Sequence, residues 1–275
     1  MFGNFGERRD RDSDRGGSNR RSFEDGNNNS FNGGRVSSSQ RASLERDQDL
    51  EARSALYLAK VMGWMCVGLL TTVVAAMATL NTEFLFMLVF GSGLGVVGIF
   101  IIQIVLVIAL SAGIGKMSPA TATFLFMAYS AVTGLTMSAF VLVYELSSLI
   151  LAFGVTTVVF LTMSAYGFIT RKDLTSMGRL AFFGLIGIIV AGVANWFLGN
   201  AMLDFAITVI GVLVFIGLIA YDTQNIKAIY QNATASGYDE YSDDVRKLAI
   251  IGALKLYLDF INLFIMMLRL LGRRR

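Results

Sequence analysis

Residues 248–271 read LAIIGALKLYLDFINLFIMMLRLL, and this stretch decides the fold. About 20 predominantly apolar residues are enough to cross the ~30 Å hydrocarbon core of a bilayer as a helix. The stretch therefore predicts a transmembrane helix, yet Asp259 stands near its middle. An ionised carboxylate at that depth costs on the order of 3 kcal/mol unless it is paired, protonated or hydrated. Asp259 thus predicts a polar partner elsewhere in the chain.

The rest of the composition indicates an all-α polytopic membrane protein. The 275 residues are 55% hydrophobic and include a single Pro, and the long uncharged runs exceed what a soluble domain of this size needs. We expect seven transmembrane helices within residues 51–275. The expected spans are residues 61–80, 86–110, 120–143, 149–169, 180–197, 205–221 and 248–271.

Residues 1–50 have a different character and predict a disordered polar tail. They are rich in Ser, Asn, Gly, Arg and Asp and poor in aliphatic residues, so they cannot bury enough apolar surface to offset the entropy of ordering. Acidic and basic side chains alternate in this tail, which argues against a nucleic-acid partner. A glycosylation sequon, Asn28-Asn29-Ser30, has meaning only if the tail is extracellular.

The charges of the short loops predict the orientation. Basic residues are retained on the cytoplasmic side of membrane proteins. Lys116 and the loop at residues 170–179 lie on one side of the expected bundle, whereas Glu83, Glu145 and Asp204 lie in the opposite turns. The tail is therefore expected to be cytoplasmic. The arginines at 273–275 oppose this rule, so a re-entrant last segment is the alternative to the full crossing that we favour.

Two residues compete as the partner of Asp259. Asp222 ends the sixth expected span, and two carboxyls within hydrogen-bonding reach would share a proton and titrate as a pair. Lys255 lies one helical turn before Asp259 on the same face, where it would form an intrahelical ion pair. Asn262 and Asn225 follow the two acids by one turn and could orient them, or could form helix–helix hydrogen bonds instead.

The absence of His excludes several enzyme classes. A Ser–His dyad and His metal sites are impossible, and any proton sensing must use carboxylates. A two-aspartate protease is disfavoured because no Gly precedes Asp259, and a retinal Schiff base on Lys255 lacks nearby Trp residues. We expect no enzyme and no cofactor. A proton-coupled transporter stays open, because paired acids also serve proton relays.

Several motifs resemble one family. YLDFINLF and LRLLG, at residues 257–264 and 268–272, look like the C-terminal signature of the Bax inhibitor-1 family, which comprises the transmembrane BAX inhibitor motif proteins and their bacterial relatives. AYDTQ at residues 220–224 resembles its sixth-span motif, and MGWM at 62–65 and TGLT at 133–136 are also similar. The resemblance covers residues 51–275.

This resemblance implies a fold with the last helix surrounded by the others, and a function. The implied function is a pH-sensitive calcium leak through a pore gated by a hydrogen-bonded aspartate pair, with Asp222 and Asp259 in that role by motif match. A basic gate residue near the second span would have to be Lys116. Expected partners are the bilayer, calcium ions and protons, in a bacterial plasma membrane. A regulator of stress and cell survival that acts through protein partners is the alternative.

Overall fold

The computed structural model describes residues 38–239, 242–273 and 275. The chain divides into two units, 1–43 and 44–275, and the described part of the first is only the start of one helix. The description below concerns the second unit. The elements are α1 (Ser38–Asn81), α2 (Glu83–Phe90), α3 (Gly93–Gly113), the 3₁₀ helix η1 (Ile114–Lys116), α4 (Pro119–Val143), α5 (Leu146–Ile169), α6 (Thr175–Leu198), α7 (Ala201–Ala235) and α8 (Asp243–Leu271).

The described residues are all-helical, without a strand, which confirms the predicted fold class. Six helices in this part of the chain, α1, α4, α5, α6, α7 and α8, are long and apolar enough to cross a membrane. A shorter apolar stretch, Val97–Gly113, lies in α3. The seven-span count stays a prediction.

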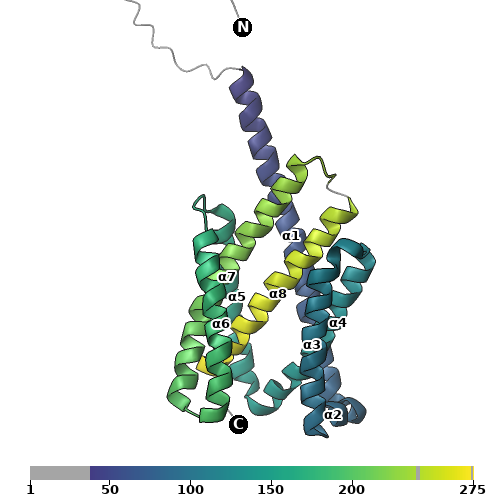
Figure 1. Ribbon diagram of the computed structural model, residues 1–275, viewed down its shortest axis with the longest axis vertical. Coiled ribbons are helices and arrows are strands. Elements are labelled where there is room, and N and C mark those ends of the chain that lie inside the picture. Colours follow the sequence, from purple (N-terminus) through teal and green to yellow (C-terminus); the bar gives the residue numbers. More distant parts are fainter. Residues whose placement is uncertain (1–37, 240–241, 274) are drawn as a thin grey trace, which may run out of the picture. The chain divides into compact units, whose positions relative to one another are not determined.

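The last helix, α8, occupies the centre of the bundle. It packs against α4, α5 and α7, and Figure 1 shows it in yellow, crossing between the α5–α7 group and the α3–α4 group. Its apolar window is 56% buried, compared with at most 33% in the other candidate spans of the described chain. The expected central position of the last helix is confirmed.

The re-entrant alternative for α8 is not supported. The helix is uninterrupted over 29 residues, and the chain that follows it is bound to the turn between α4 and α5. There the amide of Arg273 donates to the Ser148 hydroxyl at 2.9 Å, and the amide of Arg275 donates to the carbonyl of Val143 at 3.0 Å. The first turn of α8 lies at the opposite end of the bundle, next to Gly115 of η1. Thus α8 runs the full length of the bundle.

The helices differ most from the expected spans in three places: within residues 86–110, at the start of α1 and at the end of α7. The expected continuous span 86–110 is broken between α2 and α3, because Gly91 and Gly93 are poor helix formers that stand close together. The start of the third expected span, at residue 120, agrees with the structure: Ser118 caps α4 by accepting from the Thr121 amide at 3.2 Å, and Pro119 takes the first helical position.

The helix α1 starts within the segment expected to be disordered. Residues 38–50 are helical, since they contain neither Gly nor Pro, and an ion pair of 3.1 Å joins Asp49 to Arg53 one turn later. Residues 1–37, which hold the rest of the expected tail and the sequon at Asn28, lie outside the described residues.

The helix α7 extends well past its predicted end. We expected a loop from 222 to 247, but the helix continues to Ala235. The sequence after Asp222 keeps buried apolar side chains at helical spacing, Ile226 and Tyr230, and has no breaker before Gly237, which adopts a positive φ of 85°. This extension places Asp222 inside a helix.

Candidate functional site

Asp259 on α8 and Asp222 on α7 form the centre of the candidate site. The Asp259 side chain is buried, with 5% of its surface exposed, and its carboxyl lies within hydrogen-bonding reach of the Asp222 carboxyl. The second oxygen of Asp259, Oδ2, has no hydrogen-bond partner among the described residues. The structure therefore brings together the two carboxylates that the motifs singled out.

Close helix packing creates this meeting. A Cβ on Gly252 of α8 would already touch Ile226 of α7 at 3.4 Å and Val61 of α1 at 3.2 Å, so the glycine permits close contact. At the contact between α5 and α7, a Cβ on Gly167 of α5 would collide with the Ala220 carbonyl. Small residues let helix backbones approach, and the extension of α7 then places its acid at the depth of Asp259.

Lys255 pairs with Asp222 and not with its own helix neighbour. The Lys255 Nζ lies 3.6 Å from Oδ1 of Asp222, and among the described residues no ion pair joins it to Asp259. The proposed intrahelical pair between Lys255 and Asp259 was thus wrong, because the lysine reaches across to α7. The Lys255 side chain is 39% exposed and that of Asp222 only 13%, so the ammonium lies at the more exposed edge of the acid pair.

The other predicted site residues lie apart from the acid pair. Asn225 lines a separate pocket with Tyr221, and Lys116 is exposed on η1, without an ion pair in the described part of the chain. Asn262 lines a cavity on the other side of α8. The candidate site therefore consists of Asp222, Asp259 and Lys255.

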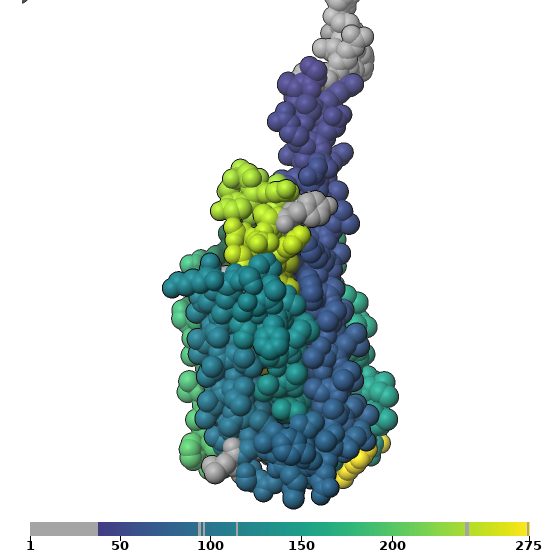
Figure 2. All heavy atoms as spheres, turned by 90° about the vertical axis from the view of Figure 1, so that its right-hand side faces the viewer, coloured from purple at the N-terminus to yellow at the C-terminus, as the bar shows by residue number. Residues whose placement is uncertain are grey.

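The cavity beside Asn262 was not predicted. Its volume is about 550 Å³, and amide, hydroxyl and guanidinium groups converge on it. The polar lining comes from Gln103, Thr133, Thr136, Asn262 and Arg269, with Tyr129 and apolar side chains of α2, α3, α4 and α8 around them. The signal was available in the sequence, since Gln103 is a lone amide in the apolar run of the second expected span. Figure 2 shows the α3–α4 face of the bundle, with α1 alongside it.

A buried hydroxyl contact next to the acid pair was also missed. Tyr257 lies two residues before Asp259, and its hydroxyl is 2.6 Å from the Thr72 hydroxyl of α1. The Tyr257 ring packs edge-on against Phe126 and Tyr129, with ring centroids 5.7 and 5.9 Å away. This contact joins α1 and α4 to the segment of α8 that carries the acid.

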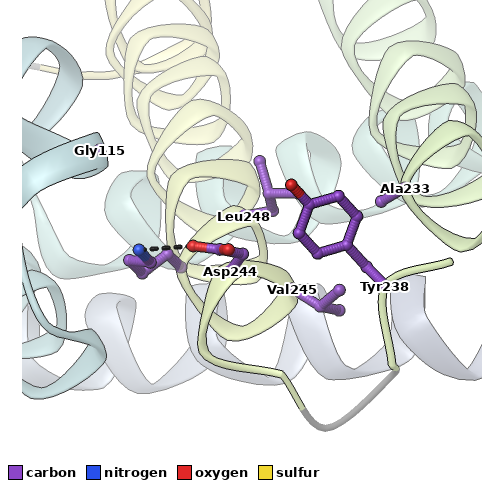
Figure 3. Close-up of a pocket in the computed structure, with 7 residues that line it drawn as sticks. Gly115, Ala233, Tyr238, Asp244, Val245 and Leu248 are labelled. Carbon is purple, nitrogen blue, oxygen red and sulfur yellow. Dashed lines mark ion pairs between the residues drawn. The ribbon is translucent and has the colours of Figure 1, made fainter. Parts of the chain in front are cut away.

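The acidic residues in the first turn of α8 are partly neutralised by basic neighbours. In the pocket of Figure 3, between η1 and the α7–α8 connection, Lys247 lies 2.6 Å from Asp244. Arg246 lies 4.0 Å from Asp243 in the same first turn. Such local pairs are typical of a solvated surface and give no support to a site that collects cations.

Comparison with known proteins gives the family. The model of "Inhibitor of apoptosis-promoting Bax1" matches residues 54–275. The chain belongs to the Bax inhibitor family. The predicted family membership is confirmed, and the protein is an integral membrane protein.

Bacterial members of the Bax inhibitor family align along nearly their whole length. The inner membrane protein YbhL of Escherichia coli K12 is 44% identical over 231 residues, which is 83% of this chain and 97% of YbhL. An uncharacterized Borreliella burgdorferi protein is 42% identical over 219 residues, 80% of this chain and 92% of its own. A Rickettsia prowazekii protein is likewise 42% identical over 219 residues, which is 80% of this chain and 90% of the Rickettsia protein.

Proposed function

We propose that this protein is a pH-gated calcium leak of the bacterial inner membrane, with the Asp222–Asp259 pair as its gate. The observation that carries the proposal is the pair itself, in which a buried carboxyl faces a second carboxyl on a neighbouring helix. Burial and mutual repulsion oppose ionisation of both groups at once, so a shared proton is the low-energy arrangement.

The direction of gating follows from this shared proton. At low pH the protonated pair holds α7 and α8 together and the path is closed. At higher pH the proton leaves, the two carboxylates repel each other, and a cation can stand between them. Calcium takes six to eight oxygen ligands, and two carboxylates supply at most four. Water and backbone carbonyls would supply the rest, and a weak site of this kind suits passage better than storage.

The cavity at Asn262 supports a hydrated approach from the other end. Its amides and hydroxyls can solvate an ion or water, and it reaches Ile261, two residues from Asp259. The basic residues of loop 170–179 and Lys116 support a cytoplasmic N-terminus by the positive-inside rule. The proposal involves no enzymatic step and no resident cofactor.

The decisive experiment is calcium flux into liposomes that contain the purified protein, from about pH 5 to about pH 8. We expect the wild-type flux to rise with pH, and Asp259→Asn and Asp222→Asn to lose this pH dependence. The matched control is Asp49→Asn, an exposed acid of α1 that pairs with Arg53 at 3.1 Å and lines neither the candidate site nor the cavity at Asn262. A flux with unchanged pH dependence in both gate variants would overturn the proposal. Proton movement without calcium flux would favour a proton-coupled transporter.

The hydrated approach has its own test, which uses the single Cys of the chain. In a Cys66→Ser background, we expect Asn262→Cys and Thr133→Cys to react with a membrane-impermeant thiol reagent. Ile189→Cys is the control, because this α6 side chain is exposed on an apolar face. Equal protection of all three cysteines would exclude a water-filled cavity.

A further inference from the structure

The loop between α5 and α6 presents two exposed basic side chains that form no ion pair within the described chain. These side chains belong to Arg171 and Lys172. The acid of the same loop, Asp173, is already engaged, because its Oδ1 accepts from the Thr175 amide at 2.8 Å. Hydrogen bonds from Thr175 hold the pKa of the Asp173 carboxyl below its usual value. The loop therefore presents two cations that form no ion pair in the described chain, beside one carboxylate that is bound to the Thr175 amide.

A single side chain of α7 holds this loop in place. The Gln224 Oε1 accepts from the Leu174 amide at 2.9 Å, and its Nε2 donates to the carbonyl of Lys172 at 2.9 Å and to that of Thr170 at 3.4 Å. One amide thus fixes the backbone on both sides of the basic pair. Gln224 lies two residues after Asp222 on the same helix.

The loop and α7 enclose a pocket of about 310 Å³. The pocket is lined by Arg171, Lys172, Asp173, Thr175, Tyr221, Gln224, Asn225 and Ala228. The Asn225 side chain makes no hydrogen bond within the described residues, so its amide is available as a further donor. Guanidinium, ammonium and amide donors around one pocket are the groups that bind a phosphate.

The surroundings of this pocket favour a lipid over a soluble anion. The last residue of α5, Ile169, and the early residues Leu180 and Phe183 of α6 are large apolar side chains that are exposed on either side of the basic loop. In a bilayer these side chains face acyl chains, while the basic loop lies at the headgroup level. Basic clusters directly beyond a membrane helix attract anionic lipids.

We propose that this pocket binds the phosphate headgroup of an anionic phospholipid, with Arg171 and Lys172 as its cationic contacts and Gln224 as a positioning residue. Headgroup binding would hold the loop against α7, next to Asp222. Its influence on the gate rests on the proposed function, whereas the binding itself does not.

The test is a binding titration of the full chain, purified in an uncharged detergent. Phosphatidylglycerol is the probe, with phosphatidylcholine and inorganic phosphate as separate arms. We expect phosphatidylglycerol to bind wild type and the double variant Arg171→Gln/Lys172→Gln to bind it at least roughly tenfold more weakly. The matched control Lys60→Gln/Arg246→Gln removes the same charge from exposed positions outside the pocket and should stay within about twofold of wild type.

Two further readouts separate the possible causes. Gln224→Ala keeps both basic side chains but frees the loop, and we expect it to weaken phosphatidylglycerol binding in part. Added salt should weaken phosphatidylglycerol binding to the wild-type protein. Retention of wild-type affinity by the double variant would overturn the proposal. Inorganic phosphate that displaces the lipid at equal concentration would overturn it in favour of a soluble anion.

Flux measurements keep this proposal distinct from the calcium leak. If the lipid binds as expected and no calcium flux occurs at any pH, only the proposed function fails. If flux and its pH dependence persist while the double variant binds phosphatidylglycerol normally, only the lipid site fails.

Discussion

The helices α8 and α6 have similar apolar character along the sequence, yet they lie in opposite environments. The apolar window of α8 is 56% buried, whereas that of α6 is 11% buried, and large exposed side chains follow most of its length. The polar groups explain the difference: α8 carries Lys255, Asp259 and Asn262 within its apolar run, and such groups must face protein or water. Hydropathy predicts that a helix enters the membrane, and the embedded polar residues predict which helix becomes the centre.

The largest effect is expected from a carboxylate placed on the lipid-facing helix. Ile189→Asp puts on α6 the group that α8 carries at 259, but without a partner, since Ile189 is exposed. We expect the folded protein to lose roughly 2.5–3.5 kcal/mol of stability. The measurements are the yield of folded protein and its unfolding transition in detergent. Ile189→Asn is the uncharged control and should cost less. If Ile189→Asp folds as well as the wild type, the conclusion that α6 faces lipid and α8 faces protein is wrong.

Two glycines of α5, Gly167 and Gly154, allow the packed and the exposed face of that helix to be compared. Gly167→Ala must displace the Ala220 carbonyl of α7, whereas a Cβ on Gly154 meets nothing within 4 Å. We expect Gly167→Ala to destabilise by roughly 1–3 kcal/mol, and Gly154→Ala to be neutral or slightly stabilising. Thermal unfolding in one detergent measures both, and equal transitions would show that α5 and α7 are not closely packed.

The ion pair between Lys255 of α8 and Asp222 of α7 tests the charge balance of the gate. Lys255→Met removes the cation 3.6 Å from Asp222, so the protonated pair should persist to higher pH. We expect the pH midpoint of the calcium flux to rise by about one unit, which corresponds to ~1.4 kcal/mol. Lys247→Met, which breaks only the pair with Asp244, is the control. A midpoint that falls would contradict this assignment of the cation.

The smallest effect concerns the hydroxyl contact beside the acid pair. Tyr257→Phe removes the group 2.6 Å from the Thr72 hydroxyl and should cost roughly 0.5–1.5 kcal/mol in unfolding. Tyr166→Phe, on an exposed face of α5, should leave stability unchanged. If the two variants unfold alike, Tyr257 contributes only its ring.

Much of the site was predictable because intramembrane acids are rare and costly. Asp259 and Asp222 were found from their position in apolar helices and from motif likeness. The sequence left open whether Lys255 pairs with Asp259, because a spacing of four residues allows such a pair but also allows a long side chain to reach a neighbouring helix. The cavity at Asn262 was not predicted, because it combines side chains from four helices.

The sequence by itself determined the helical class, the membrane location, the family and the need for a partner at Asp259. These depend on hydropathy, on the free-energy cost of burying a charge and on local motifs. Only the tertiary structure decided that α7 continues past Asp222, that Lys255 crosses to it, and that Gln224 fixes the basic loop. These features depend on which helix faces meet, and a one-dimensional pattern does not contain the rotation and approach of one helix relative to another.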